Sequence, residues 1–560
     1  MNRFRRRLTA AFGIAAVLFL LLLFLAAAEH DADGSSIHTV WDALWYFLIT
    51  LSTVGYGDMY PVTFAGKLIA SIFVLMSVGA LAFAVGSVLS LMRGELLPKL
   101  RLSRLRDCRL YILTAWNPET AALAKHIAEE DPDAWFLFSG ECGLTEVPES
   151  IGETNRGILF PGVSLETNLR RAAVKQNRCA VLVTGADLSE NDRIAAEIME
   201  AENTFEEASG SAETAGGIKE AKETGIPLYV RTVCDPELLT ERMTPFNEYD
   251  CTARMYWKQF PLRREEDRVV LIGCGEYGAR LLLRALEVNV FGPLKRTEYH
   301  IFGDASEFLR DHPELSSAVA LGPAEEDRDS VIFHEDAWNS CPELFLTAAR
   351  IVICEDREEE NLRICQEMRT WFPVSAVIHI RSSRKADGAE RFGAAEEIFT
   401  TELVMRKQLS RLGHAMHEIY RTSAGGNAPE WNELGAFLRQ SNMAAADHLA
   451  VKVRILLGHD AFPCGEVTPE LCGRAYRRWQ ETRQEGAELY RLIEHERWER
   501  FHYLRNWKYA PVRDNRIRRH HLLVPYQDLS PAEQAKDDYA WELLGQLSGS
   551  GNGGTTDEKI

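Results

Sequence analysis

The sequence predicts a membrane-embedded α-helical region, then a larger α/β body, then a mostly α-helical C-terminal module. Three observations predict this organisation. Two long uncharged apolar runs lie near the N-terminus, short β-rich runs alternate with amphipathic stretches through Tyr420, and that alternation then stops. With 560 residues and 46% hydrophobic content, the chain can fill several cores. The expected domains are 1–106, 107–260, 261–425 and 429–547, with a disordered tail at 548–560.

The composition excludes several classes of protein. A net charge of -19, from 63 basic and 82 acidic residues, argues against a nucleic-acid partner bound by neutralising phosphates over the whole chain. The 11 cysteines include no Cys-x-x-Cys pair, and all of them follow the apolar N-terminal region. We therefore expect reduced cytosolic thiols, and neither a zinc site nor a disulfide framework.

Two apolar runs, Leu8–Ala28 and Leu68–Met92, are long enough to cross a bilayer. A cleaved signal peptide is the alternative for the first run, because arginines precede it and alanines end it. The second run follows within one short loop, which favours two membrane helices. Basic residues precede the first run and follow the second, so we expect a multi-pass protein of the cell membrane with both termini cytoplasmic.

Between the two runs lies an apolar aromatic segment, Val40–Leu51, that is too short to span a membrane. A hexapeptide that suits a potassium ion follows it. Backbone carbonyls replace the hydration shell of the ion only when all of them point at one axis, which requires unusual backbone angles at alternate residues. Gly55 and Gly57 reach such angles without steric penalty. Val40–Leu51 is then a re-entrant pore helix, and the predicted filter is Thr53, Val54, Gly55, Tyr56, Gly57 and Asp58.

This hexapeptide resembles the signature of potassium channels, and the order of span, half-span, filter and span is similar to the two-span pore family. The resemblance implies that four such loops form one selectivity filter holding potassium ions. It also implies a homotetramer surrounded by membrane lipid. The alternative is a glycine-rich turn that arose by chance, which leaves the order of the four segments unexplained.

After Arg106 two series of β-rich runs predict two copies of a doubly wound, Rossmann-like unit. Phe205–Gly225 is polar, acidic and low in complexity, and we expect a mobile surface insertion there. A helix is expected at Glu119–Glu130. The expected strands are Arg109–Leu113, Ala134–Phe138, Gly157–Phe160, Cys179–Val183, Pro227–Val230, Val269–Ile272, Tyr299–Phe302, Arg350–Cys354 and Ala376–Ile380.

The second series carries a Gly-x-Gly-x-x-Gly motif between a predicted strand and a predicted helix. Such glycines let a phosphate approach the helix N-terminus, and an aspartate after the next strand suits a ribose. The alternative is that the glycines serve only strand-to-helix packing. The corresponding turn of the first copy, Thr114–Glu119, lacks glycine, so we expect no conventional dinucleotide site there. The nucleotide candidates are Gly273, Gly275, Glu276, Tyr277, Gly278 and Asp304.

Two such units behind a two-span pore resemble the tandem RCK (regulator of potassium conductance, TrkA-N type) domains of ligand-gated potassium channels. The resemblance covers roughly Cys108 to Tyr420 at the level of the fold, with only the second glycine motif matching closely. It implies a cytoplasmic gating ring whose ligand-driven expansion pulls on the inner helices.

Beyond a linker at Ser423–Pro429, the spacing of aromatic and charged residues resembles the RyR domain, with departures at Asn506, Ala510 and His521. Aromatic faces beside guanidinium groups suit a stacked base with a phosphate. The alternative is that the tryptophans are core and that Arg513–Arg519 is a solvated face. The ligand candidates are His495, Arg497, Trp498, Trp507, Tyr509, Arg513, Asp514 and Tyr526.

These expectations support a ligand-gated, potassium-selective channel whose small-molecule ligand is a nucleotide, and not an enzyme. An enzyme would turn over a nicotinamide cofactor in the Rossmann unit, but the sequence offers no catalytic constellation, and Cys274 lacks an evident base partner. A third reading is a nucleotide-binding membrane sensor or scaffold with an inactive pore, which recruits a partner through the RyR-like domain.

Overall fold

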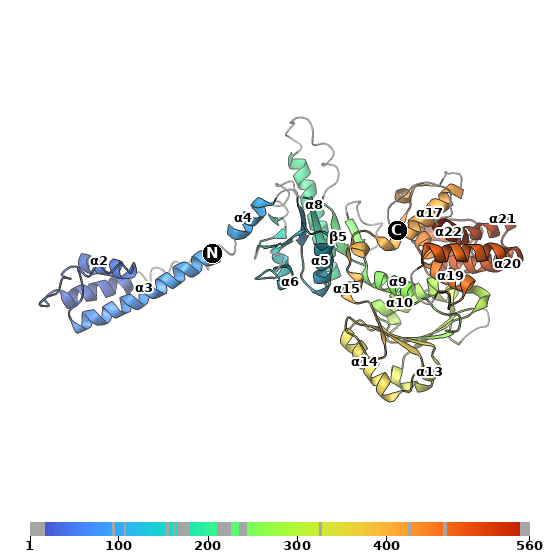
Figure 1. The fold of residues 1–560 in the computed structure, drawn as a ribbon, viewed down its shortest axis with the longest axis horizontal. Helices are drawn as coiled ribbons and strands as arrows, with labels where there is room; N and C mark the ends of the chain where they lie inside the picture. Colours follow the sequence, from blue (N-terminus) through green and yellow to red (C-terminus); the bar gives the residue numbers. More distant parts are fainter. Residues whose placement is uncertain are drawn as a thin grey trace. The chain divides into compact units, whose positions relative to one another are not determined.

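The computed structural model describes residues 17–91, 96–105, 108–152, 156–160, 163–165, 167–168, 178–209, 226–233, 243–323, 328–423, 428–462 and 467–548. The chain forms two compact units, residues 1–105 and 106–560 (Figure 1). The predicted tail lies outside the described residues from 549 onward.

The first unit is helical: residues 17–29, α2 (Val40–Leu51), α3 (Phe64–Leu91) and α4 (Leu97–Arg104). Helix α2 has the bounds predicted for the pore helix. A capping box fixes its start, because Thr39 accepts a hydrogen bond from the Asp42 amide and the Asp42 side chain accepts one from the Thr39 amide. Phe47 of α2 packs edge-to-face on Phe73 of α3, with ring centroids 4.9 Å apart.

Among the described residues, no helix combines the length and the apolarity that crossing a membrane requires. The spans predicted at Leu8–Ala28 and Leu68–Met92 are therefore not confirmed. Residues 8–16 of the first run and residue 92 of the second lie outside the described part of the chain.

The second unit contains two parallel sheets. The first has the order β3-β2-β1-β4-β5-β6 and the second the order β13-β12-β11-β7-β8-β10-β9. Each places its first strand in the interior with the chain winding outward in both directions, as in a doubly wound Rossmann fold. The predicted α/β fold with two copies is confirmed, and β6, β9, β10 and β13 are additions that the sequence did not indicate.

The first sheet consists of β1 (Arg109–Leu113), β2 (Trp135–Phe138), β3 (Gly157–Leu159), β4 (Arg178–Val183), β5 (Leu228–Arg231) and β6 (Met243–Phe246). The second consists of β7 (Arg268–Ile272), β8 (Glu298–Phe302), β9 (Ala320–Leu321), β10 (Ser330–His334), β11 (Arg350–Ile353), β12 (Val377–Arg381) and β13 (Glu390–Phe392).

The helices of the Rossmann units are α5 (Pro118–Glu130), α6 (Glu149–Gly152), α8 (Leu188–Ser209), α9 (Glu248–Gln259), α10 (Glu276–Val288), α11 (Ser306–Asp311), α12 (Leu315–Ala318), α13 (Pro342–Thr347), α14 (Glu358–Trp371), α15 (Ala395–Ile398), α16 (Thr401–Val404) and α17 (Gln408–Ser423). The predicted insertion begins inside α8, which continues to Ser209. Its remainder, 210–225, lies outside the described residues.

The two Rossmann units exchange their last helices. Helix α9 follows the first sheet but packs on α10 of the second unit, and the indole of Trp257 donates a hydrogen bond to the Leu281 carbonyl at 2.9 Å. Helices α15 and α16 follow the second sheet but pack on α5 of the first unit. Phe246 and Phe399 meet edge-to-face at 5.2 Å in that shared core. The units therefore interlock and share two cores.

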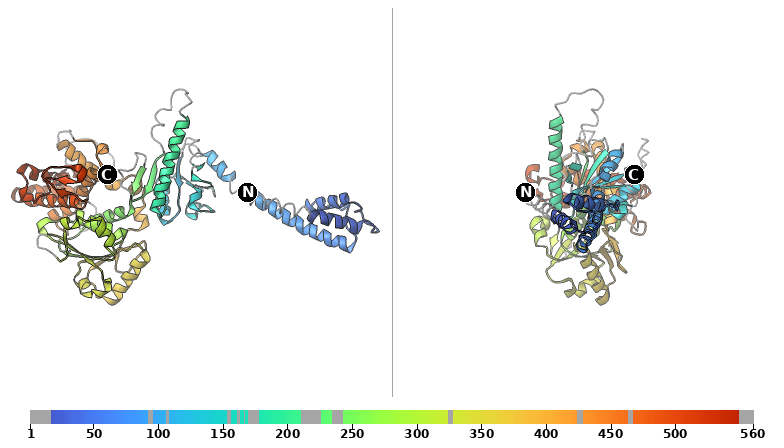
Figure 2. Two further views of the ribbon diagram at one scale, coloured as in Figure 1. Left: turned by 180° about the vertical axis from the view of Figure 1, so that it is seen from behind. Right: turned by 90° about the vertical axis from the view of Figure 1, so that its left-hand side faces the viewer.

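Helices α18 (Ala436–Asp447), α19 (Leu449–Leu457), α20 (Pro469–Tyr503), α21 (Pro531–Gln534) and α22 (Tyr539–Leu547) build the C-terminal module, with the short strands β14 (Lys508–Tyr509) and β15 (Arg519–His520). They are orange to red in Figures 1 and 2. Trp479 and Trp541 are fully buried, and the Trp541 indole donates to the Tyr490 carbonyl at 2.9 Å. The mostly helical composition agrees with the sequence, whereas the likeness to an RyR domain stays a prediction.

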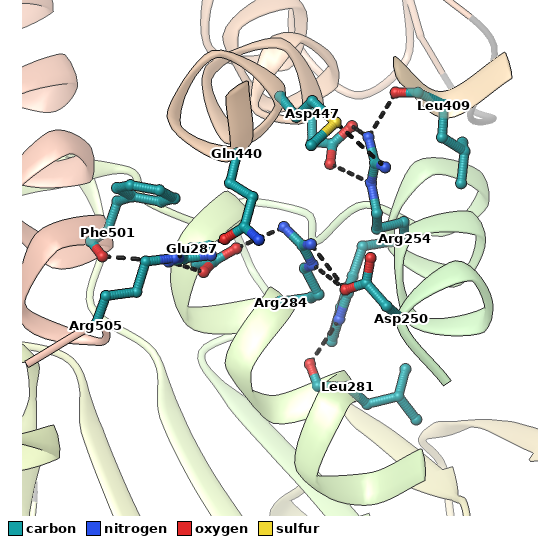
Figure 3. A network of polar contacts seen from close by, with 12 residues as sticks. Asp250, Arg254, Leu281, Arg284, Glu287, Leu409, Gln440, Asp447, Phe501 and Arg505 are labelled. Atoms are coloured by element: carbon teal, nitrogen blue, oxygen red, sulfur yellow. Dashed lines mark hydrogen bonds and ion pairs between the residues drawn. The ribbon is translucent and has the colours of Figure 1, made fainter. Parts of the chain in front are cut away.

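A buried ionic network joins the exchanged helix to the C-terminal module (Figure 3). Arg284 of α10 contacts Asp250 of α9 at 2.8 Å and Glu287 at 2.7 Å. Glu287 also accepts a hydrogen bond from Arg505, which follows α20, at 2.5 Å. Burial acts to raise the pKa of Asp250, but the positive charges of Arg284 and Arg254 outweigh it and hold that pKa below its ordinary value.

A second pair extends the network to α17 and α18. Arg254 of α9 donates to the carboxylate of Asp447 at 2.7 Å and to the Leu409 carbonyl, in the first turn of α17, at 2.6 Å. One face of α9 therefore binds both the second Rossmann unit and the C-terminal module.

Loss of one partner from this network should be costly. We expect Arg284→Met to lower the free energy of unfolding by about 1–3 kcal/mol, because it removes the shared cation of the half-buried Asp250 and of the buried Glu287, which keeps Arg505 as a partner. Arg363→Met is the control, since Arg363 pairs with Glu360 on an exposed helix face and should cost less than about 1 kcal/mol. Chemical denaturation of the full-length chain measures both. Equal effects would show that the network contributes no more than a surface pair.

Candidate functional site

The predicted filter loop has an alternating backbone. Thr53, Gly55 and Gly57 have φ of 57°, 53° and 74°, so every second residue is left-handed. A Cβ added at Gly55 or Gly57 would meet no atom within 4 Å. Glycine is therefore favoured at these two positions by the left-handed backbone, and not because a larger side chain would lack space.

Helix α2 holds this loop. The amides of Val54 and Gly55 both donate to the Ile49 carbonyl, at 3.1 Å and 3.2 Å. Trp45 of α2 donates its indole N–H to Asp58 at 3.3 Å, and its ring stacks on Tyr56 with centroids 6.4 Å apart. The side chains of Tyr56 and Asp58 thus both contact Trp45 of α2.

Glu29 fixes the other side of the loop, and the sequence did not single it out. This fully buried carboxylate accepts hydrogen bonds from the Val62 amide at 3.0 Å and from the Thr63 amide and hydroxyl at 2.9 Å and 2.6 Å. It ties the end of the first helix to the segment after the filter loop. The available signal was a single carboxylate placed directly at the end of an apolar run.

The three motif glycines of the second Rossmann unit have different roles. Gly273 has φ of 115°, and a Cβ there would lie 2.7 Å from the Glu355 amide. A Cβ on Gly278 would overlap the carbonyl of Gly273. Both serve close packing of strand and helix. A Cβ on Gly275 would instead meet only the side-chain carboxyl group of Asp356.

Asp356 occupies the position predicted for a phosphate. Its carboxylate accepts hydrogen bonds at 3.3 Å from the Glu276 and Tyr277 amides in the first turn of α10. It thereby takes the place of an anion at the positive end of the helix. A phosphate at this turn would have to displace the exposed Asp356 side chain, and the nucleotide site expected here stays a prediction.

Two other nucleotide candidates, Tyr277 and Asp304, also contact groups of the protein. The Arg381 guanidinium lies 4.0 Å from the centroid of the Tyr277 ring, whose edge meets Tyr249. Asp304 is exposed and accepts a hydrogen bond from the Ser306 amide at 2.9 Å. In the first Rossmann unit, Asn117 caps α5 by accepting from the Thr120 amide at 2.7 Å.

The structure separates the ligand candidates of the C-terminal module. His495 and Arg497 are only 4% and 2% exposed, and they bond to the Val524 carbonyl and to Glu494. Trp507 and Tyr526 are also buried, and Trp498 packs among histidines at a ring distance of 4.0 Å from His502. Tyr509 ends β14, and Arg513 and Asp514 follow in the β14–β15 loop; Tyr509 and Arg513 are exposed. The His495 ring lies 5.7 Å from that of Trp498 and 6.0 Å from that of Tyr526, so these three residues are close together, and the ligand site stays a prediction.

The module does contain carboxyl groups with altered acidity. Burial, with the charges of Glu496 and Asp537, raises the pKa of Glu499 to about 8. Burial and the charge of Glu494 raise the pKa of Asp537 to about 8. Both flank His495, at 3.7 Å and 3.8 Å. In the part of the chain that the structure describes, no set of His, Cys, Asp and Glu side chains suits a metal ion.

Comparison with known proteins concerns mainly the first unit. Residues 12–94 match the family model described as ion channel. The match includes α2, the alternating loop and α3.

Curated potassium channels resemble a short part of the chain. The human potassium voltage-gated channel subfamily A member 6 is 38% identical over 77 residues, which are 14% of this chain and 14% of that protein. A voltage-gated potassium channel of Aeropyrum pernix is 43% identical over 60 residues, 11% of this chain and 20% of that protein. The chain thus spans a small part of the length of each relative.

Solved structures of GsuK align with a larger share of the chain. The crystal structure of GsuK bound to ADP covers 71% of this chain and 99% of its own, with 14% identity and a TM-score of 0.33. The GsuK channel bound to NAD covers 73% and 86%, with 12% identity and a TM-score of 0.32. TM-scores of this size do not establish a shared arrangement of whole chains.

The different surroundings of Gly278 and Gly275 predict different costs of adding a methyl group at each position. Gly278→Ala should lower the free energy of unfolding by about 1–3 kcal/mol, because its methyl group meets fixed backbone. Gly275→Ala should cost less than about 1 kcal/mol, since it displaces only the flexible, exposed Asp356 side chain. Denaturant unfolding of the two variants gives the comparison, and a reversed order would show that Gly275 is the tightly packed position.

Proposed function

We propose that the chain is a subunit of a potassium-selective channel of the cell membrane, gated by a small ligand bound to its cytoplasmic domains. The subunit assembles as a homotetramer, so that four loops of residues 53–58 line one filter. The paired α/β units act as an RCK-type gating body, and the helical module acts as an RyR-type accessory domain.

One observation carries this proposal. Left-handed backbone at Thr53, Gly55 and Gly57 alternates with right-handed or extended backbone between them, within a segment that matches ion channels. Alternation of this kind can turn successive carbonyls toward one axis, which is what replacing the hydration shell of a potassium ion requires. The amides of Val54 and Gly55 donate to the Ile49 carbonyl of α2 and the Trp45 indole of α2 donates to Asp58, and these hydrogen bonds hold the loop in that form.

Gly57→Ala should abolish potassium selectivity, because a β-carbon disfavours φ of 74°. Gly34→Ala is a matched control, since Gly34 has φ of 84° in similarly open space but lies outside the filter loop. Ion flux into liposomes, with potassium and sodium compared, gives the readout. Unchanged selectivity in Gly57→Ala would remove the filter assignment.

Gating should pass through Arg93–Arg106, because the chain runs from the first unit into the second through this segment. A ligand shifts opening only by its differential affinity for two states, so this segment has to transmit the difference as strain. A long Gly/Ser insertion after Pro98, inside α4, should absorb that strain. We expect ligand affinity to stay nearly intact while the dependence of open probability on ligand flattens.

Single-channel recording and calorimetry on the same protein test this coupling. An equal insertion after Ser548 is the control, because it follows the last described helix and leaves α4 unbroken. Full ligand dependence with the Pro98 insertion would contradict gating through this segment.

A further inference from the structure

A hollow of about 500 Å³ runs along one face of α17, at the junction of the second Rossmann unit and the C-terminal module. Its helical lining residues recur every three or four positions, which places them on one side of the helix. Glu430, Trp431 and Asn432, which come after α17 in the sequence, also line it. The lining is Arg406, Lys407, Ser410, Arg411, His414, Glu418, Arg421, Glu430, Trp431 and Asn432.

One end of the hollow is cationic. Lys407 and Arg411 lie there, at the N-terminal turn of α17, where the helix dipole is also positive. Burial and the charge of Arg439 lower the pKa of Lys407. In the described part of the chain no carboxylate forms an ion pair with Lys407, whereas Arg411 is paired with Glu402 at 3.2 Å. Lys407 therefore offers an uncompensated charge beside another cation.

The backbone at Lys407 is strained. Its φ of 50° is left-handed, which costs a residue with a β-carbon about 1 kcal/mol or more. Glycine or asparagine would relieve this cost. Strain of this kind is retained at sites where a side chain has to be held in place, and here it presents an ammonium group to the hollow.

The other end is aromatic and can accept hydrogen bonds. The ring of Trp431 lies 5.3 Å from that of His414 and 5.9 Å from that of His417. His417 bonds to the Pro429 carbonyl at 2.8 Å, which anchors the loop that carries the tryptophan. Glu430 and Asn432 flank this ring in the lining and offer carboxylate and amide groups. A flat base could stack here with its polar edge satisfied.

The two ends are separated by the length of a nucleotide. His414, beside Trp431, is two turns of α17 from Lys407, or about 10 Å along the helix axis at 1.5 Å per residue. A nucleoside phosphate separates its base from its terminal phosphate by a comparable distance. An isolated anion would use only one end of the hollow.

We propose that this hollow binds a nucleoside phosphate, with the base against Trp431 and the phosphates at Lys407 and Arg411. As a binding site it stands on its own residues, and as the ligand site of the channel it rests on the function proposed above. The glycine turn of the second Rossmann unit, which Asp356 fills, is then not the receiving site.

Titration calorimetry of the full-length chain in detergent, with ADP and with adenosine as probes, tests this site. ADP should bind, and adenosine should bind more weakly because it lacks the phosphates. Trp431→Leu and Lys407→Gly should each weaken ADP binding about tenfold or more. Trp431→Phe should restore most of the affinity, which separates loss of stacking from loss of the fold.

The matched controls are Trp371→Leu and Lys385→Gly, which change an exposed tryptophan and an exposed lysine outside the hollow. Both should leave ADP affinity unchanged, as should Gly275→Asp at the glycine turn. Lys407→Gly has a further readout, because relief of the left-handed strain should raise the unfolding temperature while affinity falls. If Lys407 had only a structural role, Lys407→Gly would raise the unfolding temperature without lowering the affinity for ADP.

Absence of ADP binding, or binding that survives both Trp431→Leu and Lys407→Gly, would overturn the site. If Gly275→Asp abolished ADP binding while Trp431→Leu kept it, ADP would bind at the glycine turn. That result would overturn the proposed site as well. Potassium-selective flux without nucleotide tests the pore separately. Selective flux with no ADP binding would defeat only this inference, and ADP binding without selective flux would defeat only the proposed channel function.

Discussion

The ion pairs of Arg284 are the constraint on which the packing of α9, α10 and α20 depends, because Arg284 and Glu287 are buried and the Asp250 side chain is only 27% exposed. Asp250 and Glu287 both make ion pairs with Arg284, and Glu287 has a second partner in Arg505 beyond α20. A buried carboxylate without a cation is far less stable than a paired one, so the three elements have to assemble together. The helix exchange between the Rossmann units follows, because α9 reaches these partners only by leaving its own sheet.

The same constraint fixes the start of α17. Arg254 of α9 is paired with Asp447 of α18 and also bonds to the Leu409 carbonyl. On the opposite side, Arg406 contacts Glu130 of α5 at 2.8 Å. The residues just before and within the first turn of α17 thus contact both Rossmann units. A phosphate at Lys407 would lie between these two contacts, where its charge acts on each of them.

Local sequence patterns predicted where the helices and strands lie. Contacts between residues far apart in the sequence determine which groups surround the ends of these elements. The strands around β1 and β7 and the bounds of α2 followed from apolar runs, which are readable within a few positions. The short strands β9 and β13 have too few residues to show a pattern. Asp356 is far in sequence from Gly275, and nothing in a glycine motif indicates which carboxylate the fold will bring to it. Nor could the left-handed backbone of Lys407 be read from its neighbours.

The N-termini of α5, α10 and α17 in the second unit differ in the groups that lie beside them. Helix α5 is capped by the neutral side chain of Asn117, and α10 by the carboxylate of Asp356 from the neighbouring strand end. In both Rossmann turns a side chain of the protein accepts hydrogen bonds from amides at the helix N-terminus, where a phosphate would otherwise bind. Helix α17 instead begins beside a lysine with no paired carboxylate and an arginine next to it. In a chain with net charge of -19, a free anion is drawn to the place where cations outnumber carboxylates, and the start of α17 is such a place.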